Sequence, residues 1–143
     1  SLHDALPILK HRPRHRAVLD AAVALAGQPR NGSAHGVALH EAFGSIVAQV
    51  AEVSVDGARI RVHRISCAVD CGIAVHPDGV RQQVESAVYL GLSAALHERI
   101  TMANGRVQQS NYMDYPTLRF WQMPEVAVVI LPSSAPPETW SYE

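Results

Sequence analysis

The residues with the clearest chemical potential lie between residues 66 and 96 of the 143-residue chain. An apolar run ends there in Asp70-Cys71-Gly72, and the chain turns through His76-Pro77-Asp78 into an expected helix with Gln83 in its second turn. A loop that joins a strand to a helix N-terminus is a natural place to bind phosphate-like groups. A turn whose backbone angles require glycine explains Gly72 equally well, so both interpretations stay open.

Gln83 is the strongest candidate for a binding residue. Its side-chain amide offers two donors and one acceptor in a single plane, which matches the N–H and C=O edge of a heterocycle. The amide is also neutral, so it can approach a charged ligand without burying a charge of its own. The alternative is an ordinary surface amide on an amphipathic helix. The pattern of residues alone favours the surface amide.

The two cysteines do not form a chemical site. In an extended strand, Cys67 and Cys71 stand roughly 13 Å apart, whereas a disulfide allows at most about 7 Å between Cα atoms. His63 continues the same spacing, but zinc ligands must converge within about 2.3 Å of one ion. His40-Glu41 begins like a zinc-protease motif, yet Gly44 stands where the second histidine would be. We therefore predict no metal site, and we predict that both thiols serve as small packing residues.

Composition indicates one globular domain. Hydrophobic residues make up 48% of the chain and charged residues 17%, with a net charge of −1, which is ordinary for a globular protein. Four basic residues near the start, Lys10, Arg12, Arg14 and Arg16, are expected to form a solvated helix face. Nucleic acid is not an expected partner, because no aromatic residues and no second basic stripe accompany them. No apolar run reaches the roughly 18 residues of a membrane span, and no signal-peptide pattern is visible.

Hydrophobic spacing predicts the elements that position these residues. A helix is expected from Pro13 to Leu25, ended by Gly27. Residues 45–55 and the strand that starts at Ile60 form a hairpin around Asp56-Gly57. In the returning strand the apolar phase changes, which indicates either a bulge near His63-Arg64 or burial of both faces beyond it.

The second half of the chain predicts a helix, a hairpin and a strand. The helix after Pro77-Asp78 should cover the sheet with one apolar stripe, which comprises Val80, Val84, Ala87, Val88, Gly91, Leu92 and Ala95. Residues 100–102 and 107–109 should pair around Asn104-Gly105, and residues 126–131 should form a buried strand. The predicted fold class is α+β: one curved mixed sheet with two hairpins and two packing helices.

The order Asp70-Cys71-Gly72, His76-Pro77, Gln83-Val84-Glu85 resembles the last cofactor-binding segment of the molybdenum hydroxylases, the xanthine dehydrogenase and aldehyde oxidase superfamily. It is most similar to the C-terminal molybdopterin-binding region of large subunits of the isoquinoline 1-oxidoreductase and nicotinate dehydrogenase type. Two positions depart from the family pattern. Ser86 replaces a glycine, and His76 replaces an asparagine; for His76 we expect a capping role rather than chemistry.

This resemblance implies a fragment of an oxidoreductase that hydroxylates aldehydes or N-heterocyclic aromatics. Its cofactor would be molybdopterin, in the cytosine dinucleotide form, contacted by Gln83 and secondarily by Gly72. The implied partners are a small-molecule substrate, the remainder of the large subunit and a small subunit with 2Fe-2S clusters. We expect residues 1–12 to be a non-native or linker segment, residues 13–137 a partial molybdopterin-binding domain, and residues 138–143 a divergent tail.

Two other segments bear on the implied function. Residues 37–45 resemble the family's segment leading into its sheet, and they either line the substrate funnel or form an ordinary strand and turn. In the family, a catalytic glutamate in a glycine-rich stretch follows a Ser-Ser-x-Pro-Pro region. Here residues 133–137 match that region, but neither Glu138 nor Glu143 has flanking glycines. We therefore assign no catalytic residue and expect the chain alone to be inactive. The alternative is a non-catalytic α+β assembly module.

Overall fold

The computed structural model describes residues 8–135, which divide into two compact units. The sheet unit contains the described residues up to Val84 and those from Pro124 onward; the small unit is Glu85–Met123. Residues 1–7 and 136–143 lie outside the described part, and with them Glu138 and Glu143. None of the helices in residues 8–135 combines the length and apolar character that a bilayer crossing requires.

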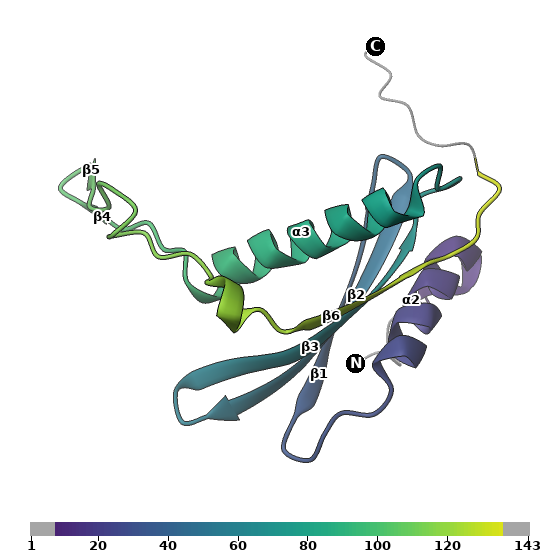
Figure 1. Ribbon diagram of the computed structural model, residues 1–143, viewed down its shortest axis with the longest axis horizontal. Coiled ribbons are helices and arrows are strands. Elements are labelled where there is room, and N and C mark those ends of the chain that lie inside the picture. The colour runs from purple at the N-terminus through teal and green to yellow at the C-terminus, as the bar shows by residue number, and fades with distance from the viewer. Residues whose placement is uncertain (1–7, 136–143) are drawn as a thin grey trace, which may run out of the picture. The chain divides into compact units, whose positions relative to one another are not determined.

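The sheet unit is built on a four-stranded mixed sheet in the order β1-β2-β3-β6 (Figure 1). Its strands are β1 (Ala34–Ala42), β2 (Ser45–Asp56), β3 (Arg59–Asp70) and β6 (Glu125–Ile130). The first three are antiparallel neighbours, and β6 runs parallel to β3. The sheet and the two long helices confirm the α+β prediction.

The hairpins of this sheet differ from the prediction in two details. Residues 37–45 form the strand and turn that was one of their two predicted alternatives, with the turn at Phe43 and Gly44 (φ angles of 49° and 68°), but the pairing of β1 with β2 as a hairpin was not predicted. In the β2–β3 hairpin, Asp56 still pairs with Arg59, so the turn lies one residue later than predicted. Gly57, with a φ of 59°, takes the left-handed conformation that this tight connection requires.

The predicted bulge lies at His63. Glu52 pairs with Arg64 and Val53 with Val62, which leaves His63 as the extra residue of β3. The His63 ring makes a 2.7 Å hydrogen bond with the Ser54 hydroxyl. Beyond the bulge, every residue from 65 to 70 is buried. Both explanations of the change in phase therefore hold at once.

The core lies between one face of the sheet and helix α2 (Pro13–Ala26) (Figure 1). A short 3₁₀ helix, η1 (Ile8–His11), precedes α2. Helix α2 ends at Gly27, which has a φ of 68°. Burying each large aliphatic side chain contributes about 1.5–3 kcal/mol relative to its exposure. The buried cluster comprises Leu9, Val18, Leu19, Ala22, Ile46, Ala48, Val50 and Ala68. Leu9, which lies within the segment expected to be non-native or a linker (residues 1–12), belongs to this cluster.

Helix α3 (Pro77–Leu96) forms where predicted, but its apolar stripe is only partly covered. Val88 is buried, whereas Ala87, Gly91 and Ala95 are not. Strand β6 is half-buried rather than buried, because it is the edge strand of the sheet and has a neighbour on one side only. The apolar pattern therefore predicted the helix and the strand correctly, but the apolar side chains of both elements are more exposed than predicted.

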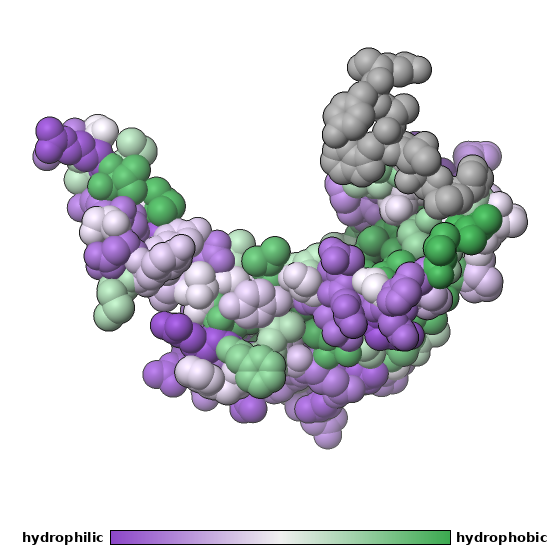
Figure 2. All heavy atoms as spheres, turned by 45° about the horizontal axis from the view of Figure 1, so that its top comes forward, coloured by the Kyte–Doolittle hydropathy of each residue, from purple (hydrophilic) through white to green (hydrophobic). Residues whose placement is uncertain are grey.

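The small unit contains a very short hairpin and a 3₁₀ helix. Strands β4 (Met102–Ala103) and β5 (Arg106–Val107) flank the predicted Asn104-Gly105 turn, and η2 spans Phe120–Gln122. The hairpin is shorter than predicted, and side-chain hydrogen bonds between Thr101 and residues 108–109 extend it. Figure 2 shows apolar side chains at the surface of the β4–β5 segment, where Met102 and Val107 are exposed.

Candidate functional site

The Asp70–Gly72 corner, the bend at the end of β3, is held by one buried carboxylate. Asp70 is only 5% exposed. Its Oδ1 accepts a hydrogen bond of 3.1 Å from the Gly72 N–H, and its Oδ2 accepts one of 2.8 Å from Arg14 Nε. The Ser133 hydroxyl is a third partner. The carboxylate therefore fixes the bend in the chain that leads towards α3.

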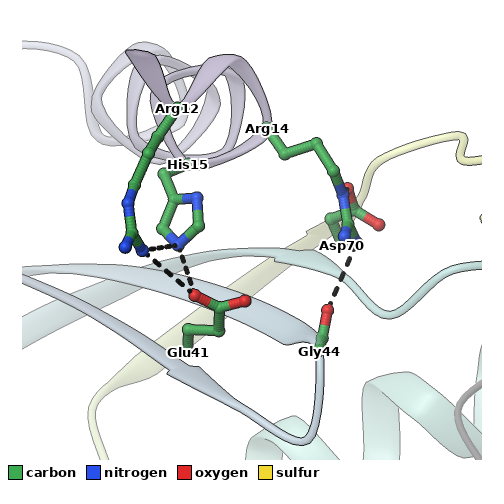
Figure 3. Close-up of polar contacts among 6 residues, drawn as sticks. All are labelled: Arg12, Arg14, His15, Glu41, Gly44 and Asp70. Carbon is green, nitrogen blue, oxygen red and sulfur yellow. Dashed lines mark hydrogen bonds and ion pairs between the residues drawn. The ribbon is translucent and has the colours of Figure 1, made fainter. Parts of the chain in front are cut away.

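Arg14 reaches this corner from the first turn of α2 (Figure 3). Its Nη2 also donates a hydrogen bond of 3.3 Å to the carbonyl oxygen of Gly44, in the β1–β2 turn. A guanidinium can serve two acceptors in this way because its donors form a rigid planar fork. Arg14 thus connects three parts of the sheet unit: helix α2, the turn at Gly44 and the end of β3.

The environment of Asp70 strongly favours its charged form. The hydrogen bond from Arg14 is the largest cause, and it lowers the pKa of Asp70 from 3.8 to about 2 against the opposing effect of burial. The Gly72 N–H and the Ser133 hydroxyl lower this pKa further. Asp70 is therefore a structural anion at neutral pH and has no role as a proton donor or acceptor there.

Residues 131–135 run alongside the corner. The Leu131 N–H donates to the Val69 carbonyl at 2.8 Å, and the Ile73 N–H donates to the Ala135 carbonyl at 3.0 Å. A cavity of about 480 Å³ lies here. Its lining comprises Pro13, Arg14, Ala17, Asp70 and residues 131–135. Because Asp70 and Arg14 already bind each other, the cavity presents no uncompensated charge of either one.

Gly72 has a clear structural role. Its φ of 73° lies in the left-handed region, where a side chain introduces strain. The residue is buried, and its N–H is already bound to Asp70. A ligand contact at Gly72 would therefore use its carbonyl group or the space that a side chain would otherwise fill.

Gln83 lies in the second turn of α3 with an exposed side chain. Within residues 8–135 its amide has no hydrogen-bond partner. Gln82 is exposed as well, so exposure alone does not distinguish the two glutamines. Among residues 8–135 no hydrogen bond joins Gln83 to Gly72, and the role of Gln83 as a ligand residue stays a prediction.

His76 has the predicted capping role. Its Nδ1 accepts a hydrogen bond of 2.7 Å from the Gly79 N–H, three residues along the chain. An N-cap side chain satisfies one of the free donors at a helix start in this way. The fit is close, because a Cβ on Gly79 would lie 2.6 Å from His76 Nδ1. This cap fixes the start of the helix that carries Gln83.

Of the two cysteines, Cys67 is buried as predicted for a packing residue. Cys67 is fully buried, and burial raises the pKa of its thiol to about 11, so it is a poor nucleophile. Cys71 is half-buried, and both thiols are free. His63 bonds to Ser54 rather than to either cysteine. Within residues 8–135, no cluster of three or more potential metal ligands occurs.

The basic residues near the start are exposed, as predicted for a solvated helix face, but Arg12, Arg14 and Arg16 also form ion pairs. Arg14 binds buried Asp70, and Arg12 and His15 lie 3.4 and 2.8 Å from the Glu41 carboxylate (Figure 3). A signal for this was present in the sequence. Arg14 stands four residues before Val18, so the two share one helix face, and Val18 is a core residue.

The small unit has an apolar cavity of about 300 Å³. Its lining comprises Ile100, Gln109, Ser110, Asn111, Tyr112 and Tyr115. The Tyr115 hydroxyl donates a hydrogen bond of 2.8 Å to Glu98 Oε2, which raises the pKa of Tyr115. The Ser110 hydroxyl likewise donates a hydrogen bond of 2.9 Å to Asp114 Oδ2. We assign no catalytic residue to this cavity.

Comparison with known proteins connects this geometry to one family. A family model described as a molybdopterin cofactor-binding domain matches residues 17–124. The chain is 37% identical over 128 residues to the beta subunit of isoquinoline 1-oxidoreductase from Brevundimonas diminuta, an alignment that covers 84% of the chain and 16% of that protein. It is 33% identical over 98 residues to a subunit of nicotinate dehydrogenase from Pseudomonas putida KT2440, covering 67% and 8%.

A solved structure shares the fold. The chain superposes on quinoline 2-oxidoreductase from Pseudomonas putida 86 with a TM-score of 0.61 and 20% sequence identity, covering 67% of the chain and 13% of that protein. The chain thus spans less than a fifth of the length of each of these proteins.

Proposed function

The chain belongs to the molybdopterin cofactor-binding domain family of molybdenum-dependent oxidoreductases, and on that premise we propose that the Gln83 amide binds the pterin of the cofactor. Gly72 is the proposed second contact. The observation that carries the proposal is the state of Gln83: an exposed amide, with no partner within residues 8–135, on a helix whose start is fixed by a side-chain cap.

The residues present fit such a ligand. A pterin edge alternates donors and acceptors, and the glutamine amide supplies both without a formal charge. The acidic residue in the first turn of α3, Asp78, is held by Arg81 at 2.9 Å, which offsets its charge near an anionic ligand. At the corner, Asp70 is neutralised by Arg14. These two carboxylates are therefore compensated within the chain.

This part of the protein would position the cofactor rather than act on the substrate. When bound, molybdopterin carries the molybdenum that supplies the two-electron chemistry of this family. We infer an aldehyde or an N-heterocyclic aromatic as substrate; the names of the isoquinoline and nicotinate enzymes are in keeping with the second of these. We also infer the cytosine dinucleotide form of the cofactor and an iron–sulfur small subunit as partner.

The test is a matched pair of substitutions in the holoenzyme that contains this sequence. Gln83→Ala removes the proposed hydrogen bonds, and each is worth about 0.5–1.5 kcal/mol, or about a 2- to 10-fold loss of cofactor affinity. Molybdenum content by mass spectrometry and pterin content by fluorescence should both fall. Gln82→Ala removes the neighbouring exposed amide and should change neither.

Equal molybdenum and pterin contents in the Gln83→Ala, Gln82→Ala and unsubstituted proteins, with equal turnover, would contradict the proposal. That result would favour the alternative that the domain serves assembly alone. The chain by itself, supplied with cofactor, is expected to show no substrate oxidation, because no catalytic residue is assigned to it.

A further inference from the structure

The Arg14–Asp70 ion pair connects segments that are far apart in the chain. Asp70 is 56 residues from Arg14, and the two side chains meet at 2.8 Å. Through Nη2, Arg14 also bonds to the Gly44 carbonyl. Because Asp70 is buried, removing its cation would leave a charge with poor access to water, which is strongly unfavourable. The position of Asp70 therefore depends on Arg14.

Asp70 in turn determines the path of the chain towards α3. Its Oδ1 holds the Gly72 N–H, and its contact with Ser133 joins the corner to residues 131–135. The Ile73 N–H binds Ala135 in the same segment. Four residues after Gly72, His76 caps the helix that carries Gln83. One carboxylate thus sets the start of the loop from which the proposed cofactor contacts extend.

We propose that Arg14 is a positioning residue for cofactor binding: by orienting Asp70 it fixes the backbone of the Asp70–Gly72 corner, and so the loop that presents Gly72 and Gln83. This inference rests on the proposed function, and it assigns a role to a helix far from both contacts in the sequence. Arg14 itself need not touch the cofactor, because its fork is already used by Asp70 and Gly44.

The geometry explains why arginine suits this position. Nε is directed at the carboxylate while Nη2 reaches the carbonyl in the β1–β2 turn. A lysine ammonium keeps the charge but lacks this fixed fork, so it can neutralise Asp70 without holding both acceptors in place. Arg14→Lys should therefore preserve most of the fold and lose part of the positioning.

The first experiment measures amide hydrogen exchange in the full chain under native conditions. In Arg14→Gln, we expect the Gly72 and Ile73 amides to exchange about 10- to 100-fold faster, as for loss of a hydrogen bond to a charged group. The exchange rates of the slowly exchanging amides of β2 should increase less, and all by the same factor. The matched control is Arg16→Gln, since Arg16 pairs with Asp20 of its own helix, at 3.4 Å, rather than with the corner.

A uniform change at the corner and in β2 would overturn the inference, because it would show that Arg14 serves global stability alone. If Arg14→Gln does not fold, Arg14→Lys decides the matter in the same way. Selective loss of protection at Gly72 and Ile73 supports positioning, and unchanged protection at both amides contradicts it.

The second experiment measures molybdenum and pterin contents of the holoenzyme. Arg14→Gln should lower both contents although Gln83 is intact, with Arg14→Lys between it and the unsubstituted protein. If Gln83→Ala lowers the contents and Arg14→Gln does not, the inference fails and the proposed function stands. A different outcome is that Gln83→Ala has no effect, while Arg14→Gln lowers both contents and accelerates amide exchange at Gly72 and Ile73. In that case the proposed role of Gln83 fails and the positioning role of Arg14 stands.

Discussion

The sheet unit and the small unit are each stabilised by a different kind of internal interaction. The sheet unit has a continuous apolar core between α2 and one face of the sheet. In the small unit, the fully buried residues within the described chain are Val88, Ser93 and Leu118. A segment of about 40 residues buries too little surface to be stable through hydrophobic contacts alone, and the small unit shows this limit.

Hydrogen bonds define the small unit in place of a core. The Tyr89 hydroxyl donates to the Leu118 carbonyl at 2.8 Å, and the Leu118 N–H donates to the Ser93 hydroxyl at 3.0 Å. Large apolar side chains remain outside: Tyr112, Met113, Phe120 and Trp121 are each more than 80% exposed. The difference teaches that stability is concentrated in the sheet unit, so substitutions of similar size should have unequal effects in the two.

The largest expected effect is loss of core packing in the sheet unit. Ile46 is fully buried in the apolar cluster, so Ile46→Ala should lower the free energy of unfolding by about 3 kcal/mol. Leu90→Ala, at a position 60% exposed on the small-unit part of α3, should cost less than about 0.5 kcal/mol. Urea denaturation followed by circular dichroism measures both, and equal costs would refute the contrast.

Acid should unfold the sheet unit through Asp70. The pKa of Asp70 is about 2 in the folded chain, against an ordinary 3.8. Its stabilisation is therefore complete above about pH 4 and is lost as the pH falls from about 4 to about 2, a change of about 2 kcal/mol. Unfolding free energies measured at pH 6, 4 and 2 should show this loss in the unsubstituted chain.

Two substitutions test the origin of that acid sensitivity. Asp70→Asn removes the titrating group, so the unfolding free energy should be lower at pH 6 and should depend less on pH below 4. Glu98 in the small unit also has a lowered pKa, through hydrogen bonds from Ser93 and Tyr115. Glu98→Gln should nevertheless leave the global acid transition where it is, and a shift of that transition would argue against separate stabilities.

In the small unit, the most sensitive position should be Ser93. This residue is 1% exposed, and Ser93→Ala leaves the buried Leu118 N–H without its acceptor, at a local cost of about 1–2 kcal/mol. Hydrogen exchange at Leu118 should accelerate while the β2 amides stay unchanged. Ser86→Ala, at an exposed position of the same helix, is the control and should accelerate neither set.

The sequence predicted features that depend on neighbouring residues. Pro13 and Gly27 bound α2 as expected, and the Asn104-Gly105 turn has the two positive φ angles that its residue types favour. The phase change in β3 located the bulge to within a residue. Each of these follows from local steric or hydrogen-bonding preferences, which a single sequence displays directly.

Features that depend on distant residues were missed. Nothing near Asp70 identifies Arg14 as its partner, because the pairing requires α2 to pack on the sheet first. A turn within residues 37–45 was one predicted alternative, but its position at Phe43-Gly44 was not predicted, since phenylalanine rarely adopts a φ of 49°. For the candidate site, the resemblance supplied Gln83 and Gly72, and the supporting contacts came from the three-dimensional structure.

The smallest expected effect on stability comes from replacing one turn glycine with alanine in each unit. Gly57 and Gly105 have φ angles of 59° and 73°, and an added Cβ would meet no atom within 4 Å at either position. Changing either glycine to alanine should therefore cost only the backbone strain, about 1 kcal/mol.

The two turns should nevertheless report this strain differently. The Gly57 turn joins β2 and β3, twelve-residue strands of the central sheet, so Gly57→Ala should lower the global unfolding free energy by the full amount. The Gly105 turn joins strands of two residues each, and such a hairpin can open while the rest stays folded. Gly105→Ala should accelerate exchange in β4 and β5 and leave the global value within error. Equal global losses for the two variants would show that the small unit unfolds together with the sheet.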